Sequence, residues 1–240
     1  MSYLSYISDE TLLSLVKNVL DIGRKRKAEA EQSFAKNVID PFAALFESAA
    51  FDVDHQTWKD SEIIRQCQKT LQNHIGDLHQ KILGSVASWE DKGKGSVVDL
   101  VCQKQKIIAE VKNKYNTVSG GKLADQYYSL ERLIEPKTSV YKGFTAYFVA
   151  IIPKSPARYD RPFHPSDKDK GKRCQRNESI REIDGASFYS LVTGEENALE
   201  NLYRVLPKII EKIFAEGGKR HYRLADKSAF YAYFDAAFKK

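Results

Sequence analysis

The chain has 240 residues, of which 42% are hydrophobic and 29% are charged, and its formal net charge is +6. This composition is typical of a globular protein and excludes disordered and collagen-like chains. The sequence contains no run of 18 apolar residues and no secretory signal at its start, so we expect neither a membrane span nor export.

The N-terminal part of the chain is predicted to be helical. Ser8 has the residue type of an N-cap, and the apolar residues that follow, up to Leu20, recur with helical spacing. This helix runs into four consecutive cations, Arg24 to Lys27. Such a run is typical of a solvated helix end, and it is also suited to contact phosphates.

A second, shorter helix is predicted after Asp40-Pro41, which have the residue types of an N-cap and a first helical position. Its apolar residues Phe42, Leu45 and Phe46 fall on one side. A longer helix is expected to begin at Asp60 or Ser61 and to end at Gly84.

Three β-rich runs follow the long helix and predict an antiparallel meander. They cover residues 86–89, 96–102 and 106–112, with a tight reversal at 103–105. A helix over 122–135 and an apolar strand over 144–152 come next, and the composition of that strand is typical of a buried central position. Further along we expect a short strand at 180–183 and helices at 187–192 and 195–215.

From residue 61 to residue 152 the predicted order is therefore helix, three strands, helix, strand. No repeat or linker interrupts the chain, which predicts a single domain over residues 1–240. The expected fold class is α/β (α+β), with a central mixed sheet flanked by helices and with helical additions at both ends of the chain.

Positive charge is concentrated between residues 154 and 181. This stretch holds nine basic and four acidic side chains, an excess of five, so it accounts for most of the net charge. A local basic segment is the electrostatic footprint of a polyanionic partner. A solvated loop has the same composition, and the charge alone does not separate the two interpretations.

Three charged residues on the predicted meander point to chemistry. Glu110 and Lys112 are two apart on one strand, so they share a face of the sheet. A hairpin that reverses near residue 104 brings Asp99, expected midway along the preceding strand, beside Glu110. Asp is depleted in strands and costly to bury without a partner, so Asp99 is unusual among its apolar neighbours.

Two carboxylates and an ammonium form a set that suits phosphodiester hydrolysis. Mg²⁺ prefers oxygen ligands and is commonly held by one or two carboxylates, water and phosphate oxygens. Such an ion acidifies a bound water and neutralises charge that develops on the phosphodiester. The lysine is suited to orient or deprotonate the attacking water and to stabilise the transition state.

This set resembles the PD-(D/E)xK nuclease superfamily. Asp99 matches the first acid, with Val98 where the motif has proline, and Glu110 and Lys112 match its second half. The predicted element order matches the αβββαβ core of that superfamily, which would cover residues 61–152. The resemblance implies a metal held by Asp99, Glu110 and the backbone carbonyl of Val111.

Two longer stretches, residues 95–130 and 180–194, resemble a small group of type II restriction endonucleases that cut GGNCC. Residues 110–117, Glu-Val-Lys-Asn-Lys-Tyr-Asn-Thr, are the most specific part. The resemblance implies Mg²⁺-dependent cleavage of both strands of double-stranded DNA, leaving 5′-phosphates, by a homodimer on a near-palindromic site. It also implies a cognate DNA methyltransferase in the same system.

Several further residues are candidates for the site. Glu47 is either the extra acid that many such nucleases carry on an upstream helix or a surface helix residue. Asn113, Lys114 and Asn116 follow the catalytic strand, so they are either DNA contacts or part of a polar turn. The basic segment, residues 153–184, is the expected DNA-recognition region.

Arg173, Arg176 and Arg181 are its candidates for reading guanine, because an arginine forks onto guanine O6 and N7 in the major groove. The commoner role of such residues is to position phosphates.

Two other functions remain open from the residues alone: a structure-specific or repair nuclease with the same core, and a non-catalytic nucleic-acid-binding protein. Three cysteines far apart in the sequence are an odd number and form no disulfide framework, which is typical of a protein in a reducing cytoplasm.

Overall fold

The computed structural model describes residues 2–34, 36, 38–93, 95–219 and 222–239. Its centre is a six-stranded mixed sheet with the order β1-β2-β3-β4-β8-β5. The strands are β1 (Glu90–Asp91), β2 (Leu100–Cys102), β3 (Ile107–Lys114), β4 (Thr145–Ile152), β5 (Asp160–Pro162) and β8 (Ile180–Asp184). β1, β2 and β3 are antiparallel, β3, β4 and β8 are parallel, and β5 runs antiparallel to β8.

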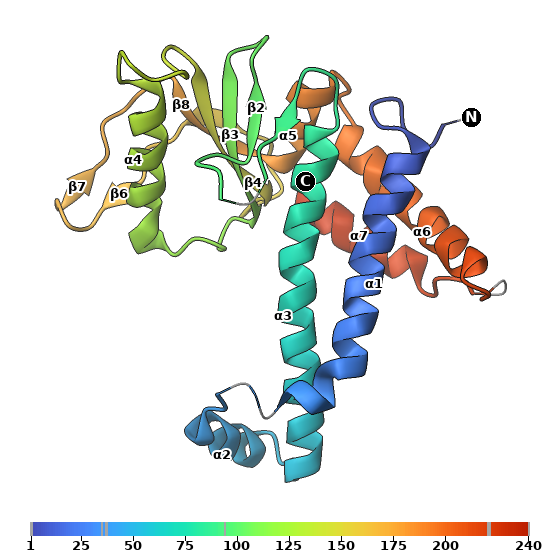
Figure 1. Ribbon diagram of the computed structural model, residues 1–240. Coiled ribbons are helices and arrows are strands. Elements are labelled where there is room, and N and C mark those ends of the chain that lie inside the picture. The colour runs from blue at the N-terminus through green and yellow to red at the C-terminus, as the bar shows by residue number, and fades with distance from the viewer. Residues whose placement is uncertain (1, 35, 37, 94, 220–221, 240) are drawn as a thin grey trace.

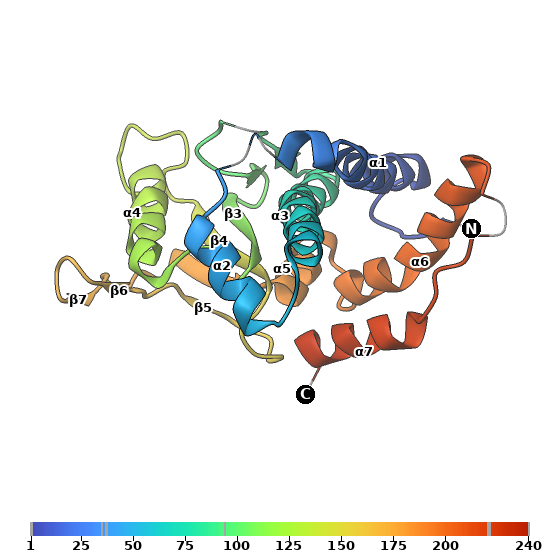
Figure 2. The same ribbon diagram turned by 90° about the horizontal axis from the view of Figure 1, so that it is seen from below.

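Helices cover both faces of this sheet, as Figures 1 and 2 show. On one face lies α4 (Leu123–Ile134), and the other face carries α5 (Gly185–Thr193), α6 (Ala198–Glu216) and the ends of two long helices, α1 (Asp9–Phe34) and α3 (His55–Gly84). The helix α7 (Lys227–Phe238) packs on α6. The prediction of a mixed sheet flanked by helices, with helical additions at both ends of the chain, is confirmed.

The two long helices form an arm that extends from the sheet. α1 and α3 pack against each other, and the short helix α2 (Pro41–Ala50) lies at the end of the arm that is remote from the sheet (Figure 1). Ser8 caps α1 by accepting a hydrogen bond from the Thr11 backbone N–H, and Asp40 caps α2. Both predicted caps are confirmed.

The start of the long helix was predicted five or six residues too late. α3 begins at His55, because the Asp54 side chain accepts from the Thr57 N–H and the Trp58 side chain that follows is buried. Its predicted end is confirmed at Gly84. A Cβ at Gly84 would lie 2.6 Å from Cβ of Asp91, so glycine allows β1 to cross the end of the helix closely.

The predicted first strand of the meander is wrong. Residues 86–89 form a turn in which Ser88 has φ of +72°, and the first strand is β1 at Glu90–Asp91. Val86 and Trp89 are nevertheless buried, and the Trp89 ring meets Phe188 edge to face. Their apolar character therefore reflects a turn packed into the core rather than a strand.

The second predicted strand is correct only in its last three residues, because β2 begins at Leu100 and residues 96–99 form a bend. Both β3 and β4 are confirmed. Six consecutive residues of β4 are buried, and the strand lies between β3 and β8 as a central strand should. The order from α3 to β4 is helix, three strands, helix, strand, as predicted.

The basic segment forms a short hairpin of its own before it rejoins the sheet. β6 (Ser166–Asp167) pairs with β7 (Lys172–Arg173), and the chain then enters β8. Phe163 stacks on Phe148 of β4, and Cys174 is buried beside α4. Figure 1 shows the hairpin at the outer side of α4.

The three cysteines, Cys67, Cys102 and Cys174, are free. Within the described residues, no helix has the length and apolar character needed to cross a membrane.

Candidate active site

The hairpin of β2 and β3 brings the predicted carboxylates together. Leu100 pairs with Ala109 and Val101 with Ile108, which is the register that puts Asp99 opposite Glu110. Asp99 itself precedes β2 rather than lying midway along it, but its N–H still donates to the Ala109 carbonyl at 3.1 Å. The predicted pairing is therefore confirmed, although Asp99 lies at the open end of the ladder.

This position gives the Asp99 carboxylate an unusual environment. Its Oδ2 accepts a hydrogen bond from the Val111 N–H at 2.7 Å. Burial and, next, the negative charge of Glu110 raise the pKa of Asp99 to about 6, and the hydrogen bond from Val111 and the charge of Lys112 offset only part of that shift. The carboxylate thus lies in a pocket of excess negative charge, where a cation would stabilise its ionised form.

Glu110 and Lys112 face the same side of β3, as their spacing predicts. Lys112 Nζ lies 2.5 Å from Glu110 Oε1, and both side chains are about four-fifths buried, with 19% of Glu110 and 24% of Lys112 exposed. Ile108, two residues earlier on the strand, packs in the cluster beneath α4. The three charged groups therefore lie on the α4 side of the sheet, beyond the end of its apolar core.

Two residues beside this set were missed by sequence reasoning. Gln80 of α3 donates to Asp91 Oδ1 at 2.7 Å, and the charge of Asp91 further raises the pKa of Asp99. Asp91 also accepts from the Gly93 N–H. The sequence marks Asp91 only as a turn residue before a glycine, and Gln80 only as one polar position on a helix, so neither carries a signal.

The donor set fits a hard divalent cation. It offers carboxylate oxygens from Asp99 and Glu110 and no nitrogen or sulfur donor, which is the chemistry that Mg²⁺ prefers. Among the described residues no three His, Cys, Asp or Glu side chains form a metal-binding group. Mg²⁺ commonly keeps several waters and takes further ligands from substrate phosphates, so two carboxylates suffice for it.

The end of β3 carries the next three candidates, which point in different directions. Asn113 turns toward α3, where a Cβ at Gly76 would lie 3.6 Å from its own Cβ, and its Oδ1 is buried without a hydrogen-bond partner in the described part of the chain. Lys114 and Asn116 are exposed at the turn that follows β3. The structure therefore leaves Lys114 and Asn116 accessible to a ligand beside the carboxylates.

Glu47, the candidate extra acid, is not brought to the set. It lies on α2, and its Oε2 accepts a hydrogen bond from the Trp58 indole N–H at 2.9 Å. α2 is at the remote end of the arm, whereas β3 is in the sheet (Figure 1). Within one chain, Glu47 fixes α2 against α3 and is far from Asp99 and Glu110.

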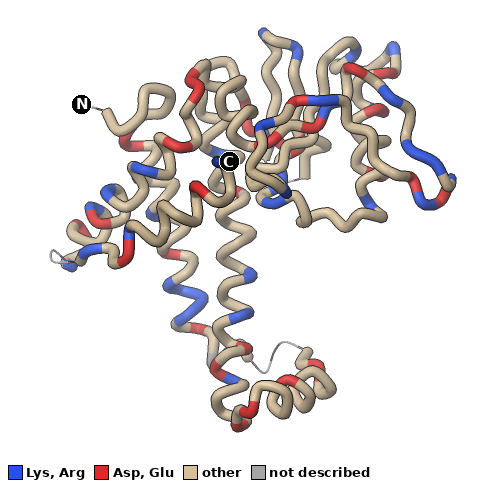
Figure 3. Tube along the Cα trace, turned by 180° about the vertical axis from the view of Figure 1, so that it is seen from behind, with Lys and Arg blue, Asp and Glu red and all other residues tan. Residues whose placement is uncertain are grey.

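The candidate arginines of the basic segment have different surroundings. Arg173 is exposed on β7 and donates to the His164 carbonyl at 3.1 Å. Arg176 is exposed and donates to Glu178 at 2.8 Å. The hairpin is fixed to α4, because Tyr128 donates to Asp167 at 2.8 Å. Both arginines thus extend from an anchored hairpin (Figure 3 shows its run of basic residues).

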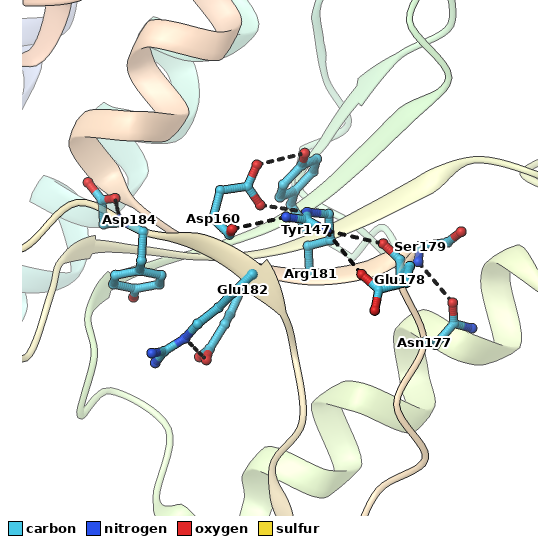
Figure 4. A network of polar contacts seen from close by, with 10 residues as sticks. Tyr147, Asp160, Asn177, Glu178, Ser179, Arg181, Glu182 and Asp184 are labelled. Carbon is cyan, nitrogen blue, oxygen red and sulfur yellow. Dashed lines mark hydrogen bonds and ion pairs between the residues drawn. The ribbon is translucent and has the colours of Figure 1, made fainter.

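Arg181 is held much more tightly, as Figure 4 shows. Its Nε lies 2.6 Å from Asp160 Oδ1, and it also pairs with Glu178 at 3.7 Å. Arg181 is aligned with Tyr147 across the ladder, whereas Glu110 is aligned with Phe148, so the two charged residues face opposite sides of the sheet. The structure therefore does not bring Arg181 to the carboxylates.

Comparison with known proteins gives a consistent result. The family model described as Eco47II restriction endonuclease matches residues 4–215. The type II restriction enzyme Eco47II of Escherichia coli is 52% identical over 239 residues, which cover 99% of this chain and 100% of that protein. The type II restriction enzyme Sau96I of Staphylococcus aureus is 30% identical over 209 residues, covering 85% of this chain and 78% of that protein. No solved structure matches the chain.

The matched residues include the sheet, the arm and the basic segment. Asp99, Glu110 and Lys112 also lie within the matched range. The chain belongs to the Eco47II restriction endonuclease family, and it is a type II restriction enzyme, a site-specific deoxyribonuclease.

Proposed function

We propose that Asp99, Glu110 and Lys112 form the catalytic centre of a PD-(D/E)xK nuclease core that hydrolyses phosphodiester bonds in double-stranded DNA with Mg²⁺. The observation that supports this most directly is the convergence of two carboxylates and one ammonium on one sheet face, with the pKa of Asp99 raised to about 6. A purely structural ion pair does not require a second, partly buried carboxylate beside it.

The roles follow from the position of each group. Asp99, Glu110 and the backbone carbonyl of Val111 would hold the ion, and the Val111 N–H fixes the Asp99 carboxylate by donating to Oδ2. When bound, Mg²⁺ supplies a water of lowered pKa and neutralises charge on the phosphate. Lys112 Nζ, released from Glu110 Oε1, donates a hydrogen bond to the attacking water and to the phosphate oxygens that gain charge.

Sequence recognition is assigned to two parts of the surface. Arg173 and Arg176 on the anchored hairpin supply donors for guanine acceptors, and Lys114 and Asn116 contact DNA next to the catalytic strand. The site is GGNCC-like, since both relatives are type II restriction enzymes and the stretches at residues 95–130 and 180–194 resemble enzymes of that specificity.

A near-palindromic site is matched by a protein with twofold symmetry, so two copies act together on one duplex. Each copy cuts one strand and leaves a 5′-phosphate, and a cognate methyltransferase protects the host sites. Within each copy, helices pack on both faces of one six-stranded sheet. This supports one restriction-endonuclease-like domain per chain, with its core at residues 61–152 and its recognition segment at 153–184.

The test is digestion of a plasmid of known sequence with purified protein. We expect discrete bands that map to GGNCC-like sites in Mg²⁺ and no cleavage in EDTA. Random nicking, or cleavage that follows DNA structure rather than sequence, would support a repair nuclease instead. Specific binding without cleavage at any divalent metal would support the non-catalytic alternative.

A further inference from the structure

The helix α2 has its apolar side turned toward solvent. Phe42, Leu45 and Phe46 fall on one side of it, as their spacing predicts, and they are 72%, 68% and 70% exposed. Phe51, which caps the helix, is 70% exposed. No residue of α2 is buried. We call the stripe of Phe42, Leu45 and Phe46 the tip patch, because α2 lies at the end of the arm (Figure 1). Phe51 lies four residues after Glu47 and therefore on the other side of the helix.

The orientation of the tip patch is fixed by the opposite side of the helix. Glu47 lies on that side, and its hydrogen bond to the buried Trp58 ties α2 to α3. Ala43 and Ala44, also away from the stripe, are partly buried. An amphipathic helix normally turns its apolar stripe toward the core. Here a polar contact and two small side chains face the protein instead, so the stripe is presented outward.

The exposed area is comparable to that of the largest apolar patch on a typical monomeric protein. A fully exposed aromatic side chain offers roughly 150–250 Å², so the two rings and Leu45, which are 72%, 70% and 68% exposed, present on the order of 350 Å² of apolar surface. The largest apolar patch of a typical monomer is about 300–600 Å² and is often functional. The tip patch alone would supply nearly half of the ~800 Å² that each partner buries in a standard interface.

The charge around the tip patch is unfavourable for DNA as its occupant. Residues 40–60 carry five acidic side chains and a single lysine, Lys59. The acidic residues are Asp40, Glu47, Asp52, Asp54 and Asp60. Such a surface repels the phosphate backbone, to which proteins bind through lysine and arginine. The same chain offers a surface of the opposite sign on α1, where Arg24 pairs with Asp21 and Lys25 with Glu29, so that the four cations Arg24 to Lys27 leave an excess of two positive charges. A second copy is therefore complementary to the tip in charge.

The length of the arm allows the tip to reach another copy on the same duplex. α3 approaches the end of β3 at Gly76, beside Asn113. The part of α3 from His55 to that point projects beyond the strand, and at about 1.5 Å per residue it extends roughly 30 Å from the catalytic face. A surface carried that far from the carboxylates can contact a copy bound to the other half of the site.

We propose that the tip patch is a self-association surface, on which a second copy of this chain docks with its basic α1 run. The symmetry is that of an isologous pair, in which each copy supplies both surfaces. The inference rests on the proposed action of two copies at one site. Apolar burial supplies the affinity, and the acidic and basic surfaces fix the orientation.

The experiment is sedimentation equilibrium of the full chain, alone and with a duplex that contains a GGNCC site, in EDTA so that no cleavage is needed. The variant is Phe42→Gln/Phe46→Gln, which keeps two good helix formers and removes apolar surface that is not part of the core. We expect the wild type to dimerise and the variant to dimerise at least 10-fold more weakly. Val140→Gln, at a residue that is 80% exposed elsewhere, is the matched control and should associate as the wild type does.

A second variant tests the charged half of the surface. Lys27→Glu should weaken the dimer, and the effect should shrink at high salt because the pair is exposed. A wild type that stays monomeric with and without the duplex overturns the inference, as does a Phe42→Gln/Phe46→Gln variant that dimerises normally. A variant that stays dimeric but binds DNA more weakly would assign the patch to DNA. None of these outcomes depends on cleavage, so an error in the catalytic assignment would leave them unchanged.

Discussion

The carboxylates at the end of β3 and the basic segment at residues 153–184 are both rich in charge, but they neutralise it differently. At the first, Asp99 and Glu110 share one nearby cation, Lys112, and the pKa of Asp99 is raised. In the second, arginines pair closely with acids: Arg161 with Glu182, Arg176 with Glu178 and Arg181 with Asp160, each at 2.6–2.8 Å.

A run of basic residues in the sequence is therefore not the same as a free basic surface. The acids that lie between the arginines in the chain, or opposite them across β5 and β8, satisfy many of those charges within the fold. The reverse holds for the carboxylates, where the fold brings like charges together at a cost in stability. The site around Asp99 and Glu110 is suited to chemistry because its negative charge is not fully neutralised, and not because it holds many charged residues.

The largest expected effect is the loss of a carboxylate. Asp99→Asn or Glu110→Gln should lower the cleavage rate by about 10³-fold or more, because each removes a charge from the proposed metal site that is worth several kcal/mol in the transition state. DNA binding in EDTA should persist or tighten, since one negative charge near the phosphates is gone. Single-turnover cleavage and gel-shift titration measure the two quantities.

Glu90→Gln is the control for this prediction. Glu90 is an exposed acid on the neighbouring strand β1, paired with Lys92 at 2.9 Å. It should cut DNA at the wild-type rate. Wild-type cleavage by Asp99→Asn would show that the centre has been assigned to the wrong residues.

Removal of Lys112 should cost less. Lys112→Ala is expected to lower the cleavage rate by at least ~10²-fold, the size of a general-acid-base or charge-stabilising contribution, while Mg²⁺ binding by the two carboxylates persists. Isothermal titration with Mg²⁺ separates binding from rate. Lys104→Ala, in the exposed turn between β2 and β3, is the control. A normal rate for Lys112→Ala would reduce Lys112 to a structural partner of Glu110.

The clustering of Asp99, Glu110 and Lys112 was predictable because it depends on strand geometry. The two-residue period of a strand puts Glu110 and Lys112 on one face, and a hairpin register is fixed once the turn is located. The same register places Asp99 opposite Glu110, even though the strand was predicted to begin too early. Two glycines with positive φ, Gly93 and Gly95, end regular pairing before Asp99, and the residue pattern alone does not show where pairing resumes.

Contacts between distant segments were not predictable. Gln80 reaches Asp91 only because Gly84 lets β1 cross the end of α3, and nothing local to either residue marks this contact. Likewise, the apolar spacing of α2 predicted its stripe correctly, but spacing alone does not show whether a stripe faces the core or solvent. The hydrogen bond from Trp58 to Glu47 fixes which side of α2 faces the protein. Because it joins two different helices, the spacing within α2 does not reveal it.

Base reading offers a sharper comparison inside the basic segment. Arg173→Ala should cost about 1–3 kcal/mol of binding to a GGNCC duplex and little for a scrambled duplex, as for an arginine that forks onto guanine. Arg181→Ala should leave binding to both duplexes unchanged, because Arg181 pairs with Asp160 on the other side of the sheet. Binding is measured without Mg²⁺ at several salt concentrations.

A phosphate-binding arginine would behave differently. It would weaken binding to both duplexes alike and reduce the salt dependence. If Arg173→Ala and Arg176→Ala both behave in that way, base reading lies elsewhere, and the exposed Lys114 and Asn116 become the next residues to test.

The smallest expected effect concerns an acid of the basic segment that serves only the fold. Asp184 is 1% exposed, caps α5 by accepting from the Ser187 N–H at 3.0 Å, and also accepts from the Tyr159 N–H at 2.6 Å. Asp184→Ala should lower the free energy of unfolding by about 1–2 kcal/mol, because it removes the cap and leaves a backbone donor unpaired. Urea unfolding measures the loss, and Glu178→Ala, which removes an exposed acid paired with Arg176, should stay within about 0.5 kcal/mol of the wild type. Equal losses in the two variants would mean that burial does not separate the structural acids of this segment from its surface acids.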